Sequence, residues 1–124
     1  MKNLKDYAHF YIGQDIDTGT GRVTLVGVHI DKINETSRMV VLNGNVTHTM
    51  DFDNCNLILR PLESITDEEA HGLPNQYISA KDFHIWYNHY NGHLKPAEVL
   101  ALLNMGFDLF GLIEAGIALN KTKI

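Results

Sequence analysis

The chain has seven histidines in 124 residues, and three of them, His84, His89 and His93, lie close together. Imidazole is a common zinc ligand, and residues four apart lie on one face of a helix, so His89 and His93 could bind one metal ion. Asn91 and Gly92 lie between them, however, and such a pair usually ends a helix. His84 and His89 are separated by about 140° around a helix. Because structural zinc normally takes four ligands, these histidines are only weak metal candidates, and we expect no cofactor. A His-based metal-binding protein is the second alternative function.

The single cysteine, Cys55, follows His48, Asp51 and Asp53 in the sequence. A thiol, an imidazole and a carboxylate are the groups of a nucleophilic catalytic site. In a tight hairpin, however, these side chains are not expected to come within hydrogen-bonding distance of one another. A lone cysteine most often behaves as a small buried hydrophobic residue. We therefore predict that Cys55 is buried and that the protein is not an enzyme.

The charge balance makes nucleic acid an unlikely partner. The net charge is −5, with six Lys/Arg and seven Asp/Glu in residues 1–62 and four and eight in residues 63–124. Binding to phosphates depends on clustered cations, and the sequence shows no cluster. Nucleic-acid binding through the first half is kept as an alternative function. Its contacts would be Arg22, Lys32 and Arg38. The apolar runs are too short to span a bilayer, so no membrane association and a cytoplasmic location are expected.

The first half of the chain has the alternation and composition of β-strands. Strands are expected at 7–12, at 22–30, on both sides of Asn43-Gly44 and at 56–60, with a long loop over 13–21. Gly27 within the second strand predicts a bulge. Pro61 ends the last strand, because proline lacks the N–H that a sheet ladder needs. Arg60-Pro61 therefore divides a β half from a helical half.

Asn43-Gly44 is the clearest local signal. Both central residues of a type I′ turn need a positive φ, and Asn-Gly is the pair that tolerates it best. A two-residue turn at this pair aligns Val41 with Val46 and places His48 opposite Met39. The predicted hairpin then has Met39, Val41, Val46 and His48 on one face.

The order of these strands and loops resembles the SH3-like barrel, although an OB-like barrel or an open sheet fits nearly as well. The predicted fold class is α+β: a five-stranded antiparallel SH3-like or OB-like small barrel followed by about four short helices. We expect residues 1–124 to form a single domain, with a β portion at 1–62 and a helical portion at 63–124. A fold of this kind does not by itself define a ligand.

The second half contains several helix start and stop signals. Thr66 and Glu69 form a capping box, Ser79 with Asp82 starts a second helix, and Pro96 suits the first position of a third. Asp108 is expected to cap a fourth helix over 109–115. The last apolar residues, 117–119, are an extended segment that could add to a sheet edge.

Two segments, 58–64 and 106–118, carry a resemblance to known sequences. The first reads Ile-Leu-Arg-Pro-Leu-Glu-Ser, and the second contains Phe-Asp-x-x-Gly-Leu-Ile-Glu-x-Gly. Together they resemble small uncharacterised proteins encoded by bacteriophages and prophages, in which a strand ending in Leu-Arg-Pro-Leu leads into helices. The resemblance covers about 20 of the 124 residues. It implies a phage or prophage setting, hence the cytoplasm of a host cell, and no catalytic residues.

The most aromatic face of the chain is formed by Phe83, Trp86, Tyr87 and Tyr90, at positions i, i+3, i+4 and i+7 of the second helix. Such a stripe most often packs against the core. If Trp86, Tyr87 or Tyr90 stays exposed, it could anchor a partner, because Trp and Tyr are enriched at interface hot spots. The sequence therefore predicts a protein interaction or assembly module, which binds a protein partner or a second copy of itself.

Overall fold

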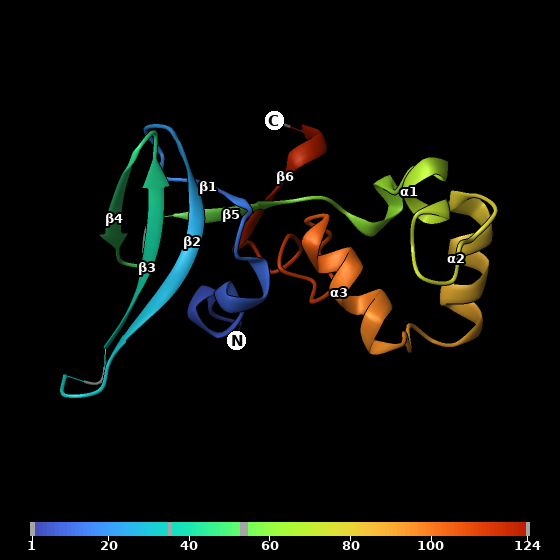
Figure 1. Ribbon diagram of the computed structural model, residues 1–124, viewed down its shortest axis with the longest axis horizontal. Helices are drawn as coiled ribbons and strands as arrows, with labels where there is room; N and C mark the ends of the chain where they lie inside the picture. Colours follow the sequence, from blue (N-terminus) through green and yellow to red (C-terminus); the bar gives the residue numbers. More distant parts are fainter. Residues whose placement is uncertain (1, 35, 53–54, 124) are drawn as a thin grey trace.

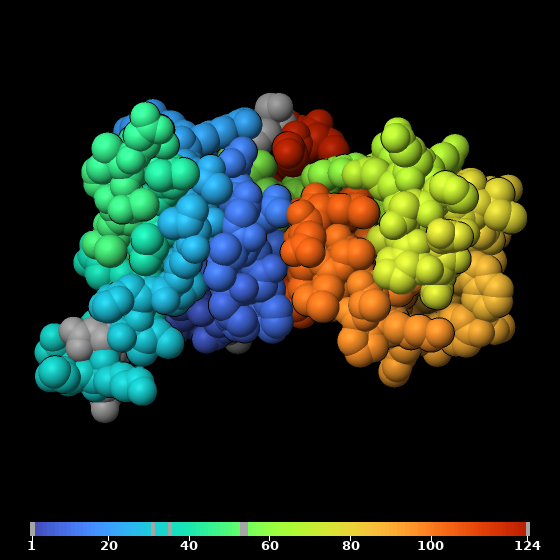
Figure 2. Space-filling view, in the orientation of Figure 1, coloured from blue at the N-terminus to red at the C-terminus, as the bar shows by residue number. Residues whose placement is uncertain are grey.

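The computed structural model describes residues 2–34, 36–52 and 55–123. These residues form one six-stranded mixed sheet and three α-helices, which confirms the α+β class (Figure 1). The strands are β1 (Asp15–Asp17), β2 (Arg22–Asp31), β3 (Thr36–Asn43), β4 (Val46–Met50), β5 (Asn56–Leu59) and β6 (Ala118–Asn120). The helices are α1 (Asp67–His71), α2 (Ala80–His89) and α3 (Pro96–Asn104), with short 3-10 helices η1 (Leu4–Asp6), η2 (Ala8–Tyr11), η3 (Leu62–Ser64) and η4 (Lys121–Lys123). The molecule is elongated, with β4 near one end and α2 near the other (Figures 1 and 2).

The sheet is open, so the predicted five-stranded barrel is wrong. Its strand order is β4-β3-β2-β1-β5-β6, and every neighbouring pair is antiparallel except β5 and β6. Two of its strands come from segments outside the predicted barrel strands. β1 forms within the predicted 13–21 loop, because Ile16 is fully buried between two aspartates. The C-terminal segment pairs parallel to β5 as β6. This confirms the expectation that it could add to a sheet edge.

The predicted first strand, residues 7–12, contains instead the 3-10 helix η2, and η1 lies directly before it. Leu4, Ala8 and Tyr11 are the buried residues of this segment, and their spacing of i, i+4 and i+7 is helical. The helical period begins at Leu4, which lies outside residues 7–12. Within 7–12 alone, the alternation of side chains suggested a strand. Without a strand at 7–12, the sheet lacks the element that would have closed a barrel.

The hairpin forms, but its turn lies one residue later than predicted. The turn residues are Gly44-Asn45 rather than Asn43-Gly44, and Gly44 has a φ of 64°. A positive φ at the first central position is typical of a type II′ turn with glycine there. The observed pairs are Met39 with Met50, Val40 with Thr49, Val41 with His48, Leu42 with Thr47 and Asn43 with Val46. Because each partner moves by two residues, every side chain keeps its predicted face.

Most local signals of the first and second halves are confirmed. The β2–β3 register shifts between Leu25 and Gly27, as expected of a bulge. The Thr66 capping box is complete, and Pro96 is the first residue of α3. The predicted fourth helix is wrong, since residues 109–117 form turns. Gly111 has a φ of 73° and breaks any helix there, while the Asp108 carboxylate accepts from the N–H groups of the turn.

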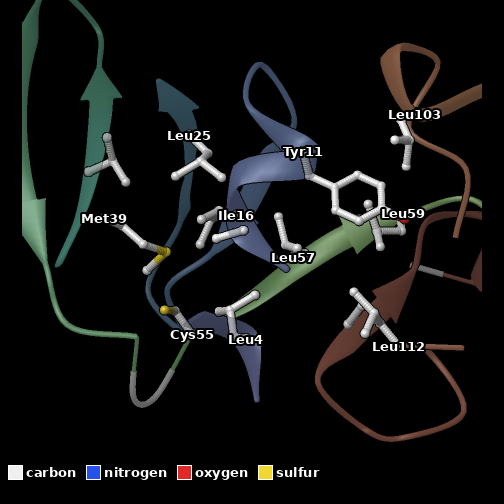
Figure 3. Packing of buried hydrophobic residues seen from close by; sticks show 13 residues of the cluster. Leu4, Tyr11, Ile16, Leu25, Met39, Cys55, Leu57, Leu59, Leu103 and Leu112 are labelled. Carbon is white, nitrogen blue, oxygen red and sulfur yellow. The ribbon is translucent and has the colours of Figure 1, made fainter. Parts of the chain in front are cut away.

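Two hydrophobic clusters fill the interior, a sheet cluster and a helical cluster, and Leu109 packs against both. The buried residues of the helical cluster are Ile65, Ala70, Leu73, Tyr77, Phe83, Leu102 and Phe107. In the sheet cluster, Leu57 and Leu59 of β5 lie beside Leu25, Ile16 and Tyr11 (Figure 3). Tyr11 connects the clusters, because its hydroxyl donates to the Phe107 carbonyl at 2.9 Å and accepts from the Leu109 N–H at 3.2 Å. Burial of this hydroxyl raises the pKa of Tyr11 above its ordinary value.

Arg60 joins the sheet to the helices. Its N–H donates to the Gly106 carbonyl, and its carbonyl accepts from the Asp108 N–H, both at 2.8 Å. Its guanidinium lies 4.4 Å from the centre of the Phe107 ring and forms a two-pronged ion pair with Glu69. The predicted division of the chain at Arg60-Pro61 is therefore also the place where its two parts are bonded together.

The substitution Gly106→Ala is expected to destabilise the protein by about 2 kcal/mol. Gly106 follows α3 with a φ of 84°, and a residue with a Cβ pays about 1–2 kcal/mol for that conformation. The new Cβ would also lie 2.5 Å from the Gln14 Oε1 atom. Gln14 would then move and lose its hydrogen bond to the Asn104 carbonyl, which is 3.0 Å long. Urea unfolding followed by circular dichroism measures the loss.

Gly116→Ala is the matched control, because Gly116 has a similar φ of 81° and open space around its missing Cβ. This variant reports the backbone cost alone, about 1 kcal/mol. Equal losses for the two variants would contradict the role of the Gln14 contact.

Candidate interaction site

Helix α2 carries the aromatic face, and hydrogen bonds fix its start. The Ser79 Oγ atom accepts from the Asp82 N–H, and the Asp82 Oδ2 atom accepts from the Ile78 N–H, each at 3.1 Å. The Ala80 N–H donates to Asp67 Oδ1 at 2.8 Å, which ties α2 to α1. The helix start predicted at Ser79 and Asp82 is therefore confirmed, and α2 is held firmly on the helical cluster.

The four aromatic residues form two rows on α2. Phe83 and Tyr87 stack with ring centres 5.8 Å apart, and Phe83 is fully buried in the helical cluster. Trp86 and Tyr90 stack with ring centres 5.4 Å apart and ring planes within 13° of parallel. This second row is exposed: 44% of Trp86 and 52% of Tyr90 remain accessible to solvent. The aromatic stripe is thus divided into a core row and a surface row.

Trp86 and Tyr90 line a surface hollow of about 530 Å³. Its other walls are the loop 75–77, the Asp82 side chain and the segment 93–95. A volume of this size is within the range of ordinary ligand pockets, about 300–1,000 Å³. The lining therefore combines aromatic rings with one carboxylate, one lysine and one imidazole.

A buried carboxylate supports the 75–77 wall of the hollow. Glu98 of α3 is only 1% exposed, and its oxygens accept from the Asn75 N–H at 2.9 Å and from the Tyr77 hydroxyl at 3.1 Å. The Asn75 side-chain amide donates in turn to the Tyr77 hydroxyl at 3.2 Å. Burial and the negative charge of Glu98 raise the pKa of Tyr77, and the Asn75 hydrogen bond opposes them. At neutral pH the Tyr77 hydroxyl therefore remains a donor to Glu98.

The sequence did not identify these wall residues. Asn75, Gln76 and Tyr77 lie in an irregular loop, and Gln76 adopts a φ of 49°, which no local motif predicts. Glu98 occupies the first turn of α3, where an acidic residue ordinarily needs no explanation beyond the helix dipole. Its burial depends on a loop more than twenty residues away in the chain.

The three clustered histidines are placed separately. The His84 ring lies 5.3 Å from Phe83, and the His89 ring packs edge-on against Tyr90 at 4.9 Å. His93 lines the hollow, beyond the residues that end α2. In the parts of the chain that the structure describes, no group of three His, Cys, Asp or Glu residues could hold a metal ion.

The cations proposed for the nucleic-acid alternative do not converge. Arg22 begins β2 and Lys32 follows its end, so about 30 Å of extended chain separates them. Arg38 lies on β3 and forms an ion pair with Asp51 at 3.0 Å.

Cys55 is buried, as predicted, in the cluster that contains Leu4 and Met39 (Figure 3). Its thiol donates to the carbonyls of Asp51 and Phe52, each at 3.4 Å. His48 is exposed on β4, and Asp53 lies outside the described residues.

Comparison with protein-family models, with curated proteins and with solved structures found no match to this chain. None of the described helices has the length and apolar character needed to traverse a lipid bilayer. The resemblance to phage and prophage proteins therefore stays a prediction.

Proposed function

We propose that this protein is a non-catalytic interaction module, of the phage or prophage accessory type, that binds a protein partner in the hollow beside α2. The observation that supports this most is the exposure of the stacked Trp86 and Tyr90 rings inside a concave surface. Tryptophan and tyrosine are the side chains that most often carry binding energy at protein interfaces. A concave site suits a projecting loop or a chain end of the partner.

The surroundings of the rings fit an interface. Asp82, His93 and Lys95 line the hollow together with the aromatic rings, and protein contacts usually combine aromatic side chains with polar groups. The acidic groups near the hollow already have structural roles, since Asp82 accepts from the start of α2 and Glu98 is buried.

Trp86 is the only tryptophan in the sequence, so its fluorescence reports directly on the hollow. The wild-type protein would be immobilised and exposed to host-cell lysate, and captured proteins would be identified by mass spectrometry. A purified partner should shift Trp86 emission to shorter wavelength. Trp86→Ala should weaken its binding by about 30-fold, because hot-spot truncations cost about 2 kcal/mol or more.

Leu100→Ala is the matched control, since Leu100 is a large exposed apolar residue of α3 that does not line the hollow. This variant should retain full binding. Capture that is equally strong with Trp86→Ala would contradict the proposal. Salt-dependent recovery of nucleic acid that Arg22→Ala and Lys32→Ala abolish would support the alternative function instead.

A further inference from the structure

The two edge strands of the sheet, β6 and β4, differ in how well they are protected from pairing with another chain. β6 has three residues and is followed by η4, which carries Lys121 and Lys123. Short edge strands and nearby lysines are devices that keep a sheet edge from pairing with another chain. β4 has five residues, Val-Thr-His-Thr-Met, without a lysine or a proline, and its register with β3 has no bulge.

β4 also has backbone groups available along its outer side. In an antiparallel ladder, alternate residues direct their N–H and C=O groups toward the neighbouring strand and away from it. Thr49 is one of the outward residues, because Asn43 and Val46 flank a two-residue turn, and the residues hydrogen-bonded to β3 alternate from Val46 to His48. Its carbonyl also accepts from Arg38 Nη2 at 3.4 Å. A carbonyl oxygen has a second acceptor site. Thr47, two residues earlier, has the same orientation as Thr49.

We propose that β4 is an interface for a second copy of this chain, and that two β4 strands pair antiparallel about a two-fold axis through His48. This alignment uses the whole strand, with Val46 opposite Met50 of the second copy and Thr47 opposite Thr49. The outward groups of Thr47 and Thr49 then face each other and form the new hydrogen bonds. A single patch that pairs with itself is the form that two-fold symmetric dimers take.

Charge favours a second copy at this edge. The chain carries a net charge of −5, so two copies repel each other over most of their surfaces. β4 contains no Asp, Glu, Lys or Arg, and the carboxylate of Asp51, one residue after it, is paired with Arg38. In the symmetric alignment Asp51 lies opposite Asn45 of the second copy, and the two Asp51 residues are about 20 Å apart.

The association is expected to be weak. Pairing of two five-residue strands buries less than the roughly 1,200 Å² of a typical stable interface. We expect a dissociation constant of about 10–100 μM. Dimerisation should therefore be visible at high protein concentration and lost on dilution.

Sedimentation equilibrium of the full chain tests the interface with Thr47→Pro. Proline removes the outward N–H of Thr47 and is tolerated on an edge strand where that N–H faces solvent. The variant should keep the wild-type circular dichroism spectrum and weaken dimerisation at least about 10-fold, which is the loss of about 1.4 kcal/mol. Thr47→Val keeps the N–H and should dimerise like the wild type. A wild-type protein that is monomeric at 1 mM, roughly ten times the upper expected constant, would overturn the proposal.

Cross-linking tests the alignment independently, in case Thr47→Pro fails to fold. In a Cys55→Ala background, His48→Cys places two thiols at the axis, where Cα atoms of a pair are about 4.5–5.5 Å apart and a disulfide fits. Val46→Cys is the control, because its two copies would be about 13 Å apart along the strands. Mild oxidation should give a covalent dimer with His48→Cys only. Equal cross-linking of both variants would overturn the proposed pairing.

Discussion

Replacing Glu98 with alanine is expected to lower the free energy of unfolding by about 3 kcal/mol. The Glu98 carboxylate is buried and accepts from the Asn75 N–H and the Tyr77 hydroxyl. The Glu98→Ala substitution would leave both donors without this acceptor, and a buried donor that loses its partner costs about 1–3 kcal/mol. The missing side-chain volume adds a cavity. Urea unfolding, followed by the fluorescence of Trp86 and by circular dichroism, measures the loss.

Two variants separate the causes of this loss. Glu98→Gln keeps the volume and one acceptor oxygen, so it should lose only about 1 kcal/mol. Glu114→Ala removes an exposed carboxylate and should change stability by less than about 0.5 kcal/mol. Because Asn75 and Tyr77 form a wall of the hollow, Glu98→Ala should also alter Trp86 emission in the folded protein. A Glu98→Ala protein as stable as the wild type would show that the carboxylate does not support this wall.

Replacing Glu69 with glutamine is expected to cost about 2 kcal/mol at pH 7 and almost nothing near pH 2. The hydrogen bonds from Arg60 lower the pKa of Glu69 from 4.5 to about 2. A carboxyl group with a lowered pKa stabilises the folded state above its unfolded pKa, and the contribution is lost as the pH falls toward the folded value. The relevant window is therefore pH 4.5 to 2. The side chains of Arg60 and Glu69 are 20% and 25% exposed, so solvent reduces the full effect of about 3 kcal/mol.

Glutamine isolates the charge, because it can still accept from the Thr66 N–H in the capping box. The difference in unfolding free energy between wild type and Glu69→Gln would be measured at pH 7, 4.5, 3 and 2. It should shrink steadily below pH 4.5. Arg60→Met, which keeps an apolar stem over the Phe107 ring, completes a double-mutant cycle. A difference that is independent of pH would contradict the assigned pKa.

Local sequence signals located the starts of α1, α2 and α3, because each signal acts within a single helical turn, whereas the Asp108 signal did not produce a fourth helix. The Thr66 and Glu69 pair, the Ser79 and Asp82 pair and Pro96 each mark a helix start in the structure. Such caps depend on backbone geometry within a single turn. They need no knowledge of the rest of the chain.

The sheet was harder to predict because its arrangement depends on distant partners. Residues 118–120 become a strand only beside β5, about sixty positions earlier. The 7–12 segment is helical because Tyr11 reaches Phe107 and Leu109, nearly a hundred positions later. Alternation over six residues cannot distinguish these outcomes.

The site was predicted in part. The spacing of Phe83, Trp86, Tyr87 and Tyr90 identified the aromatic face, but it could not show that Phe83 and Trp86 point in different directions. That division is set by the position of α2 on the helical cluster. Asp67 of α1 helps to fix this position, because it accepts a hydrogen bond from the start of α2. The hollow exists because Glu98 holds the 75–77 loop beside these rings.

The placement of β4 and α2 at opposite ends of the long axis has a geometric consequence. A dimer joined through β4 would point its two Trp86 hollows outward, away from each other. Such a particle is a two-headed connector, and each head can engage a target without crowding the other. On a repetitive surface, simultaneous engagement of both heads would raise the apparent affinity by about 10²–10⁴ when the spacing matches.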